Sequence, residues 1–363
     1  MQTHIDRKAD LPEDRLRFSR RSLGFRALLA SAFGAVAPTA FGHDPSLPKP
    51  ETPNGSTLQP LADSDGIKRV TLTAQVVNQT LLDADGKQVV AIAYGFNGGS
   101  PGPTLVFEEG DRVAITVINM LPEPTAIHWH GIIVPNSQDG VPDIGQPTPK
   151  IQPGGQYTYQ YTIVQPAGTH MYHGHMDGAK QDLLGLTGGF IILPKNAGGV
   201  RYDRDLIYWL HGWNLPQNMM GAALKDRPFT GSSTDTVNSV TMQPNWAADA
   251  HNFFSMNGKC YPSTQTINVA LRQRIRVRFF NIEIMSHQMH FHGQNFLHIA
   301  EDGVTLREPI EMNTIVVDQG KTQDILIEAI NPGLWPLHCH FAHHQTNNLS
   351  SGFGGMAAVI RIS

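Results

Sequence analysis

The C-terminal part of this 363-residue chain contains the sequence WPLHCHFAHH at residues 335–344. It places Cys339 between His338 and His340 and adds His344 five residues after the cysteine. In a β-strand, neighbouring side chains point to opposite faces of the sheet, and residues two apart share a face. Cys339 is therefore predicted to face one metal site, while His338 and His340 face another on the far side of the strand. At ~3.3–3.6 Å of chain per residue, the two sites lie roughly a dozen Å apart.

Three further segments contain histidine pairs with the same spacing of two residues. The pairs are His128 with His130, His173 with His175, and His290 with His292, and the last pair follows His287. Each pair is predicted to direct two imidazoles from one strand toward one point. Imidazole and thiolate groups are ligands for copper, zinc and iron, whereas magnesium and calcium prefer oxygen.

The number of ligands narrows the choice of metal. The four pairs supply eight imidazoles, which are too many for one ion and fit a cluster of three. His287, Cys339 and His344 remain as two nitrogens and one sulfur, and with a weak axial group these describe a blue-copper electron-transfer site. Zinc is the rival, but structural zinc sites are usually tetrahedral and rich in cysteine, and this chain has two cysteines. We therefore interpret the set as copper ligands.

At these residues the chain resembles the multicopper oxidases, the family of laccases and bacterial copper oxidases. The resemblance covers most of the chain from about residue 70 onward. Around the histidine pairs it includes the sequences PGPT at 101–104, DGVP at 139–142 and NPGLW at 331–335. The resemblance implies that His287, Cys339 and His344 hold a type 1 copper, which accepts electrons from the substrate.

The resemblance also implies roles for the remaining candidate residues. His128 and His290 would hold the type 2 copper. The paired type 3 coppers would be held by His130, His173, His175, His292, His338 and His340. Asp139 matches the acid that supports proton delivery near this cluster. The implied cofactor content is four coppers per chain: one type 1, one type 2 and two type 3.

Two positions depart from the family pattern. The axial group of the type 1 copper normally lies five residues past the last histidine, which is Leu349 here. A Gly-Met pair stands seven residues further on and offers Met356 instead. Spacing favours Leu349 and donor chemistry favours Met356, and we give spacing the greater weight; a missing thioether would raise the copper's potential. Gln345 stands where several relatives carry a carboxylate, which leaves the second proton donor unassigned.

The N-terminal region has the features of an export signal. The sequence SRRSLGF at residues 19–25 precedes an apolar run at 27–41 that Gly34 and Pro38 interrupt. The run is too short and broken for a membrane-spanning helix, so we predict no stable membrane anchor. Twin arginines before a modest apolar stretch are typical of the Tat route. Residues 1–42 are therefore predicted to be a Tat-type signal peptide, and the mature protein to be periplasmic or secreted.

Charge and cysteine content restrict the partners. The formal net charge is −4, and without residues 1–42 the remaining 20 basic and 27 acidic side chains give −7. No basic patch stands out, so nucleic acid is not an expected partner. If Cys339 binds copper, Cys260 has no cysteine left in the chain for a disulfide, and we predict that it is a small packed side chain.

Short alternating segments, such as 112–117 and 274–279, are common, and 35 glycines and 25 prolines mark turns between them. This pattern predicts an all-β protein. Residues 43–61 are proline-rich and are predicted to be a linker. Two similar halves follow, at 62–195 and 196–363, and each has the size of one cupredoxin-like Greek-key β-sandwich domain, the second with the type 1 site.

The leading hypothesis is an exported oxidase. It would couple one-electron oxidation of a phenolic or aromatic compound, or of a low-valent metal ion, to the four-electron reduction of dioxygen to water. A two-domain chain resembles the smaller laccases, in which the two halves meet across subunits, so we predict a homotrimer with its clusters at the subunit interfaces. One alternative is a copper nitrite reductase-like enzyme, whose catalytic centre is a single copper with three imidazoles. Another is a non-enzymatic periplasmic copper-binding protein.

Overall fold

The computed structural model describes residues 47–85, 87–195, 200–215 and 251–363. The predicted signal peptide lies outside these ranges, and so do residues 196–199 at the predicted start of the second half. The described residues all belong to one compact unit. Within its described part we find no helix with both the length and the apolar character needed to cross a lipid bilayer.

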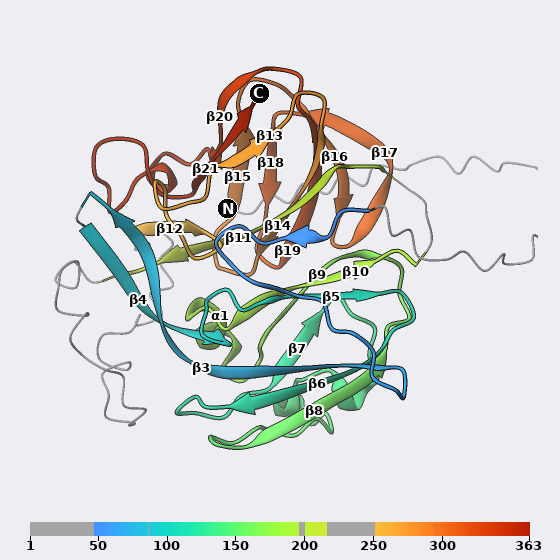
Figure 1. The fold of residues 1–363 in the computed structure, drawn as a ribbon. Coiled ribbons are helices and arrows are strands. Elements are labelled where there is room, and N and C mark those ends of the chain that lie inside the picture. Colours follow the sequence, from blue (N-terminus) through green and yellow to red (C-terminus); the bar gives the residue numbers. More distant parts are fainter. Residues whose placement is uncertain (1–46, 86, 196–199, 216–250) are drawn as a thin grey trace, which may run out of the picture. The chain divides into compact units, whose positions relative to one another are not determined.

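The first half of the chain folds into two sheets that enclose an apolar core (Figure 1). One sheet has the order β2 (Thr57–Leu58), β5 (Thr104–Glu108), β10 (Thr187–Leu193), β9 (Gly168–Gly174), β7 (Ile127–His130), and the other β4 (Lys87–Phe96), β3 (Ile67–Ala84), β6 (Arg112–Asn119), β8 (Gln156–Thr162). Trp129, Tyr159 and Phe190 are fully buried in this core. Strand β6 contributes to this core through the alternation of its side chains, because every second side chain of a strand faces the core.

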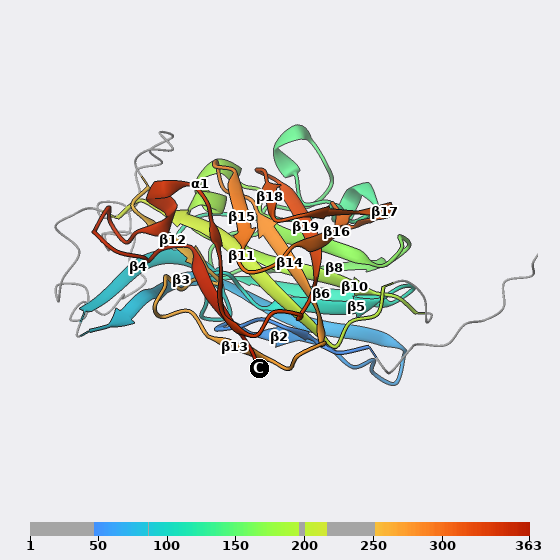
Figure 2. The same ribbon diagram turned by 90° about the horizontal axis from the view of Figure 1, so that it is seen from above.

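The second half forms a second pair of sheets. One contains β1 (Pro50–Glu51), β11 (Arg204–Trp213), β14 (Arg274–Asn281), β19 (Lys321–Glu328), β16 (Phe296–Glu301) and β17 (Val304–Met312), with β12 (Phe253–Met256) beside β11; the other contains β13 (Ile267–Val269), β21 (Ala357–Ile362), β20 (Gly333–Cys339), β15 (His287–Phe291) and β18 (Thr314–Val317). The neighbouring strands β11, β14 and β19 can be followed in Figure 2. Cys339 and Met289 lie fully buried in the core of this sandwich.

Helical structure in the described residues is short. It consists of the α-helix α1 (Gly178–Leu183) and the 3-10 helices η1 (Asn136–Gln138), η2 (Pro142–Ile144) and η6 (Ala342–Gln345). The prediction of an all-β chain with two cupredoxin-like sandwiches is confirmed.

The predicted linker is part of both sandwiches. Its residues Pro50–Glu51 pair in parallel with β11, and Thr57–Leu58 pair in parallel with β5. The first sandwich therefore begins before residue 62, where we predicted its start. Proline does not prevent this, because β1 and β2 each lie at the edge of a sheet, where a missing N–H donor is tolerated.

A buried ionic network joins the two sandwiches. Arg278 of β14 donates to both carboxylate oxygens of Asp205 at 2.7 Å, and all but 1% of its side chain is buried. It also donates to the hydroxyl of Thr169, on β9 of the first sandwich, at 2.6 Å. Thr169 in turn donates to Asp324 of β19. Alternation in β14 therefore turns this arginine toward the neighbouring sandwich and not toward water.

The long hairpin of β3 and β4 makes a second connection. Val77 and Leu81 pack in one cluster with Trp213 and Phe253 of the second sandwich. The backbone N–H of Cys260 donates to the carbonyl of Leu81 at 2.7 Å. Cys260 is fully buried in this cluster, as expected for a packed side chain.

Candidate metal centres

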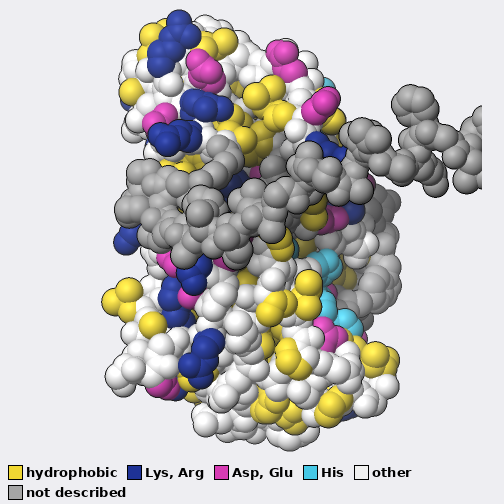
Figure 3. Space-filling view, turned by 90° about the vertical axis from the view of Figure 1, so that its right-hand side faces the viewer, with side chains coloured by type: hydrophobic (Ala, Val, Ile, Leu, Met, Phe, Trp, Pro, Cys, Tyr) yellow, Lys and Arg dark blue, Asp and Glu magenta, His cyan; other side chains and the backbone are white. Residues whose placement is uncertain are grey.

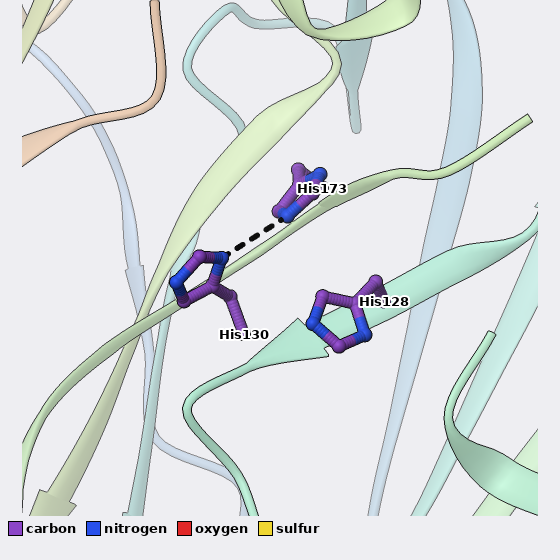
Figure 4. Close-up of side chains that lie close together, drawn as sticks. All are labelled: His128, His130 and His173. Atoms are coloured by element: carbon purple, nitrogen blue, oxygen red, sulfur yellow. Dashed lines mark hydrogen bonds between the residues drawn. The ribbon is translucent and has the colours of Figure 1, made fainter. Parts of the chain in front are cut away.

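Strands β7 and β9 of the first sandwich carry four of the predicted histidines. The strands are antiparallel, with His128 opposite His173, while His130 ends β7 and His175 follows β9. The His128 ring centroid lies 5.4 Å from that of His173 and 5.4 Å from that of His175. Nδ1 of His130 lies 3.4 Å from Nε2 of His173 (Figure 4). One nitrogen from each of His128, His130 and His173 lies within 4.8 Å of the others. We call these four residues the first set.

Strands β15 and β20 of the second sandwich carry a matching group. His290 lies opposite His338, while His292 and His340 follow directly after the two strands. The His290 ring centroid lies 4.7 Å from that of His292 and 5.5 Å from that of His340. Nε2 of His292 lies 2.9 Å from Nε2 of His338. We call these four residues the second set.

Both sets reach the molecular surface. His292 and His340 are exposed, and His128, His130 and His175 are half-buried. Histidine side chains gather visibly on the face shown in Figure 3. Over the described residues, each ring contact between these eight histidines joins two members of the same set. Each sandwich thus supplies one group of four imidazoles.

The third set is His287, Cys339 and His344, which begin β15, end β20 and lie in η6 respectively. Sγ of Cys339 lies 3.2 Å from Nδ1 of His344 and 3.9 Å from Nδ1 of His287. The two Nδ1 atoms are 3.2 Å apart, and all three side chains are buried. Bonds of about 2.0–2.3 Å, as His and Cys make to zinc, would reach one ion from all three atoms. Two imidazoles and one thiol in this geometry fit a copper ion.

The histidine rings are oriented by hydrogen bonds to backbone carbonyls. Nδ1 of His128 donates to Asp139 O at 2.9 Å, and Nδ1 of His290 donates to Asn313 O at 2.7 Å. His338 donates in the same way to the carbonyl of Cys339 at 2.8 Å. A proton held on Nδ1 leaves the Nε2 lone pair free, which is the arrangement that metal-binding histidines use.

Two family models match this chain, both described as multicopper oxidase, over residues 76–197 and 226–355. The matches contain the ligand sets just described. The chain belongs to the multicopper oxidase family. Copper resistance protein A of Pseudomonas syringae pv. tomato is 30% identical in an alignment 264 residues long, which covers 65% of this multicopper oxidase and 42% of that relative. The multicopper oxidase MmcO of Mycobacterium tuberculosis is 26% identical in an alignment 341 residues long, which covers 89% of this chain and 64% of the relative. The chain thus spans less than half the length of the first relative.

Solved structures match over more of their own length. A multicopper oxidase named mgLAC superposes with a TM-score of 0.67 at 28% identity, over 82% of this chain and 86% of that one. The blue copper oxidase from Nitrosomonas europaea gives a TM-score of 0.64 at 28% identity, over 81% and 86% of the two chains.

In this multicopper oxidase the alternative axial positions lie in different environments. Leu349 is 73% exposed and has a left-handed backbone, with φ of 55°. Met356 is fully buried in the same cluster as Cys339. Its N–H donates to the carbonyl of His344 at 2.9 Å, and its carbonyl accepts from the N–H of Cys339 at 3.0 Å. The exposure of Leu349 argues against it as the axial group, although spacing favours it. The burial of Met356 agrees with the donor chemistry, which favours Met356.

Asp139 lies beside the first set, where the resemblance places it. Its Oδ1 is 3.4 Å from Nδ1 of His128, and its Oδ2 accepts from Nε2 of Gln146 at 2.7 Å. The backbone turns directly after Asp139, and this turn requires glycine at position 140. Gly140 has φ of 88°, and a Cβ there would lie 1.9 Å from the carbonyl oxygen of Ile127.

Two carboxylates near the sets, one half-buried and one fully buried, were missed at the sequence level. Asp182 of α1 lies 3.0 Å from Nδ1 of His173 through its Oδ1. Glu283 is fully buried, and its Oε1 lies 2.5 Å from Nε2 of His287. The signal for Glu283 is its place four residues before His287, just after an apolar strand. Asp182 had no comparable signal, because the turn between β9 and α1 brings it back to the histidine.

Burial and neighbouring charges set the protonation of the ligand rings. Burial, together with His287, lowers the pKa of His344 to about 2. Burial, together with His173, lowers the pKa of His130 to about 4. Burial also opposes charge on His287, but the Glu283 carboxylate and Cys339 outweigh it and raise the pKa of His287 to about 9. The His344 and His130 rings are thus neutral and ready to bind, whereas a metal at His287 displaces a proton.

Proposed function

We propose that this chain is an oxidase that transfers single electrons from a reducing substrate to dioxygen and forms water. The observation that supports the proposal is that residues of two sets are neighbours in the sequence. Cys339 of the third set lies directly between His338 and His340 of the second set. Bound copper would supply reversible one-electron chemistry at the third set and a four-electron reserve for dioxygen overall.

Within this proposal each group of residues has its own role. His287, Cys339 and His344 would hold the type 1 copper, and Met356 packs in the same buried cluster as Cys339. Peptide bonds connect the Cys339 sulfur to the ligands on either side, so an electron arriving at the sulfur has a covalent path to them. The eight imidazoles of the first and second sets would hold three further coppers, and His128 and His290 would bind the type 2 ion among them.

Asp139 is proposed to hold and orient protons for dioxygen reduction. Gln146 occupies one carboxylate oxygen, so the other faces His128. A carboxylate placed beside a reacting centre transfers protons as a general acid or base. The proposal assigns this one proton donor only, because the amide of Gln345 has no acidic proton to give.

We also propose a homotrimer in which the first set of one protomer meets the second set of the next. The supporting observation is that each set has four imidazoles and is partly open to solvent. A head-to-tail interface that closes after three subunits would bring each first set to one second set. Export by the Tat route to the periplasm or the exterior completes the proposal and rests on the twin arginines.

The three-imidazole centre of a nitrite reductase leaves most of the first and second sets without a role, so the oxidase is the better fit.

Replacement of Cys339 by Ser tests the proposal. The variant should lose the blue absorption and all oxygen consumption with a phenolic dye, while the electron paramagnetic resonance signal of the type 2 copper remains. A blue variant that still consumes oxygen would refute the assignment.

A further inference from the structure

Each set of four imidazoles contains one histidine that is followed by a glycine with a left-handed backbone. We call these two histidines, His130 and His292, the outer ligands. Gly131 follows the first with φ of 79°, and Gly293 follows the second with φ of 84°. Over the described residues, neither outer imidazole donates a hydrogen bond to a carbonyl or carboxylate oxygen. The direction of each outer imidazole therefore depends on the backbone turn that follows it.

The imidazole of His170 lies opposite Gly131 on the neighbouring strand. His130 pairs with Met171 in the register of β7 and β9, so the next position brings Gly131 to His170. A Cβ at Gly131 would lie 2.8 Å from Nδ1 of His170. A Cβ at Gly303, in the turn between β16 and β17 of the second sandwich, would lie 2.7 Å from Nε2 of the same ring. His170 is 7% exposed, so its ring fills a slot between bare backbone segments of the two sandwiches.

Trp335 has the same place in the second set. Phe291 pairs with Leu337 in the register of β15 and β20, so Gly293 lies opposite Trp335 two positions further on. A Cβ at Gly293 would lie 2.5 Å from the indole ring. The indole N–H donates to the carbonyl of Asn331 at 2.7 Å, and the side-chain amide of Asn331 donates to the carbonyl of Gly293 at 2.8 Å. The indole is thus tied to the glycine that it covers.

The two rings occupy equivalent positions in the two halves of the chain. His170 lies three residues before His173, and Trp335 lies three residues before His338. An aromatic ring packed over a glycine of the adjacent strand supplies contacts that the glycine lacks and helps to fix the strand register. Because the arrangement recurs at both sets, we connect it with the histidines and not with general core packing.

We propose that His170 and Trp335 are positioning residues for copper. Each ring holds a glycine turn in place, and the turn directs the outer ligand before it, His130 or His292, toward the metal. The inference rests on the copper sites of the proposed function and adds to them two side chains that bind no metal. A cavity of about 200 Å³ lies beside His130 and is lined in part by His170. Without this ring the cavity would grow, and the His130 imidazole would have room to turn away.

Copper retention tests the proposal independently of oxygen consumption. The copper-loaded protein is dialysed against increasing concentrations of a chelator, and copper per chain is measured by mass spectrometry beside the blue absorption. His170→Ala should weaken copper binding at the other sites by about 10- to 100-fold, as loss of a ligand's supporting partner does, while the blue absorption is retained. His170→Phe keeps a ring over the glycine and should bind copper as wild type does. If His170→Ala does not fold, His170→Leu, which fills the slot without a flat ring, replaces it with the same expectation.

His298→Ala is the matched control. His298 is also 7% exposed, but it lies in β16, and its Nε2 donates to the carbonyl of Ala300 at 3.0 Å. This variant should lose stability without losing copper. In a chain that already carries His130→Ala, removal of the His170 ring should weaken copper binding no further, because the ligand that the ring positions is gone.

Three results would overturn the proposal: copper loss in His298→Ala equal to that in His170→Ala, copper loss in His170→Phe, or a further loss when His170→Ala is added to His130→Ala. Trp335→Ala extends the test to the second set, and wild-type copper retention in this variant would overturn the equivalence of the two rings. If the variants lose copper as expected but wild type consumes no oxygen, the oxidase is refuted and the positioning role stands.

Discussion

Complementation between two inactive variants can test whether each cluster forms across subunits. His128→Ala removes a ligand from the first set, and His290→Ala removes one from the second. Each variant alone should bind type 1 copper and remain blue, but it should not reduce dioxygen, because every cluster lacks an imidazole. Both histidines are partly solvent-accessible, so the substitutions leave the apolar cores intact.

The expected recovery follows from the arrangement of the sets. In a mixed trimer, an intact cluster needs a first set from a His290→Ala chain and a second set from a His128→Ala neighbour. With equal amounts and random assembly, about one quarter of the interfaces meet both conditions in a closed head-to-tail ring. Co-expressed and copurified chains should therefore recover about a quarter of the wild-type oxygen consumption per type 1 copper.

The control is a mixture of His128→Ala with His130→Ala, which share a damaged set and should recover nothing. Oxygen consumption is measured with a Clark electrode, and the subunit ratio by mass spectrometry of the intact assembly. If mixed assemblies containing both original variants stay inactive, the first and second sets combine within one chain, and the interfacial model is wrong.

Three further results are expected. Burial lowers the pKa of His211 to about 4, so between pH 7 and pH 5 the unfolded chain takes up a proton at this residue and the folded chain does not. The metal-free protein should therefore lose about 2 kcal/mol of stability from this residue as the pH falls from 7 to 5. Urea titrations in which wild type and His211→Phe lose the same stability between these pH values would contradict this. Arg278→Met leaves Asp205 buried without its partner and should lower the free energy of unfolding by about 3–5 kcal/mol. Adding Asp205→Leu to the same chain should restore most of this loss. Calorimetry measures the stability of the single and the double variant, and a double variant that loses the sum of the two single losses would argue against the pair. Asp139→Asn should slow dioxygen reduction by about 10²–10⁴-fold, whereas anaerobic bleaching of the blue colour by substrate, followed by stopped flow, should keep its rate; equal slowing of both steps would count against a proton-transfer role.

The grouping of the candidate site residues could be predicted from the sequence because their spacing is a local property. Residues two apart on a strand share a face wherever the strand lies, so each histidine pair converges without help from the rest of the fold. The alternating segments predicted β-structure for the same reason. The structure places all eleven predicted ligands in three groups, and β7, β9, β15 and β20 carry or adjoin most of them as the spacing requires.

Other features depend on which segments meet, and spacing does not contain that information. Met356 packs in the cluster of Cys339 and Leu349 does not, because the chain after η6 makes a surface excursion before it returns to the core. The predicted linker adds a strand to each sandwich because free sheet edges were available to it.

The ligand types, their pairing and the all-β class can thus be read from the chain alone, since they follow from side-chain chemistry and the two-residue period of a strand. Two features required the folded arrangement: the contact of Glu283 with His287, and the division of the eight candidate imidazoles into two open sets of four. Each set of four joins strands that lie far apart in the chain, and both features are fixed by how the strands and turns pack against one another.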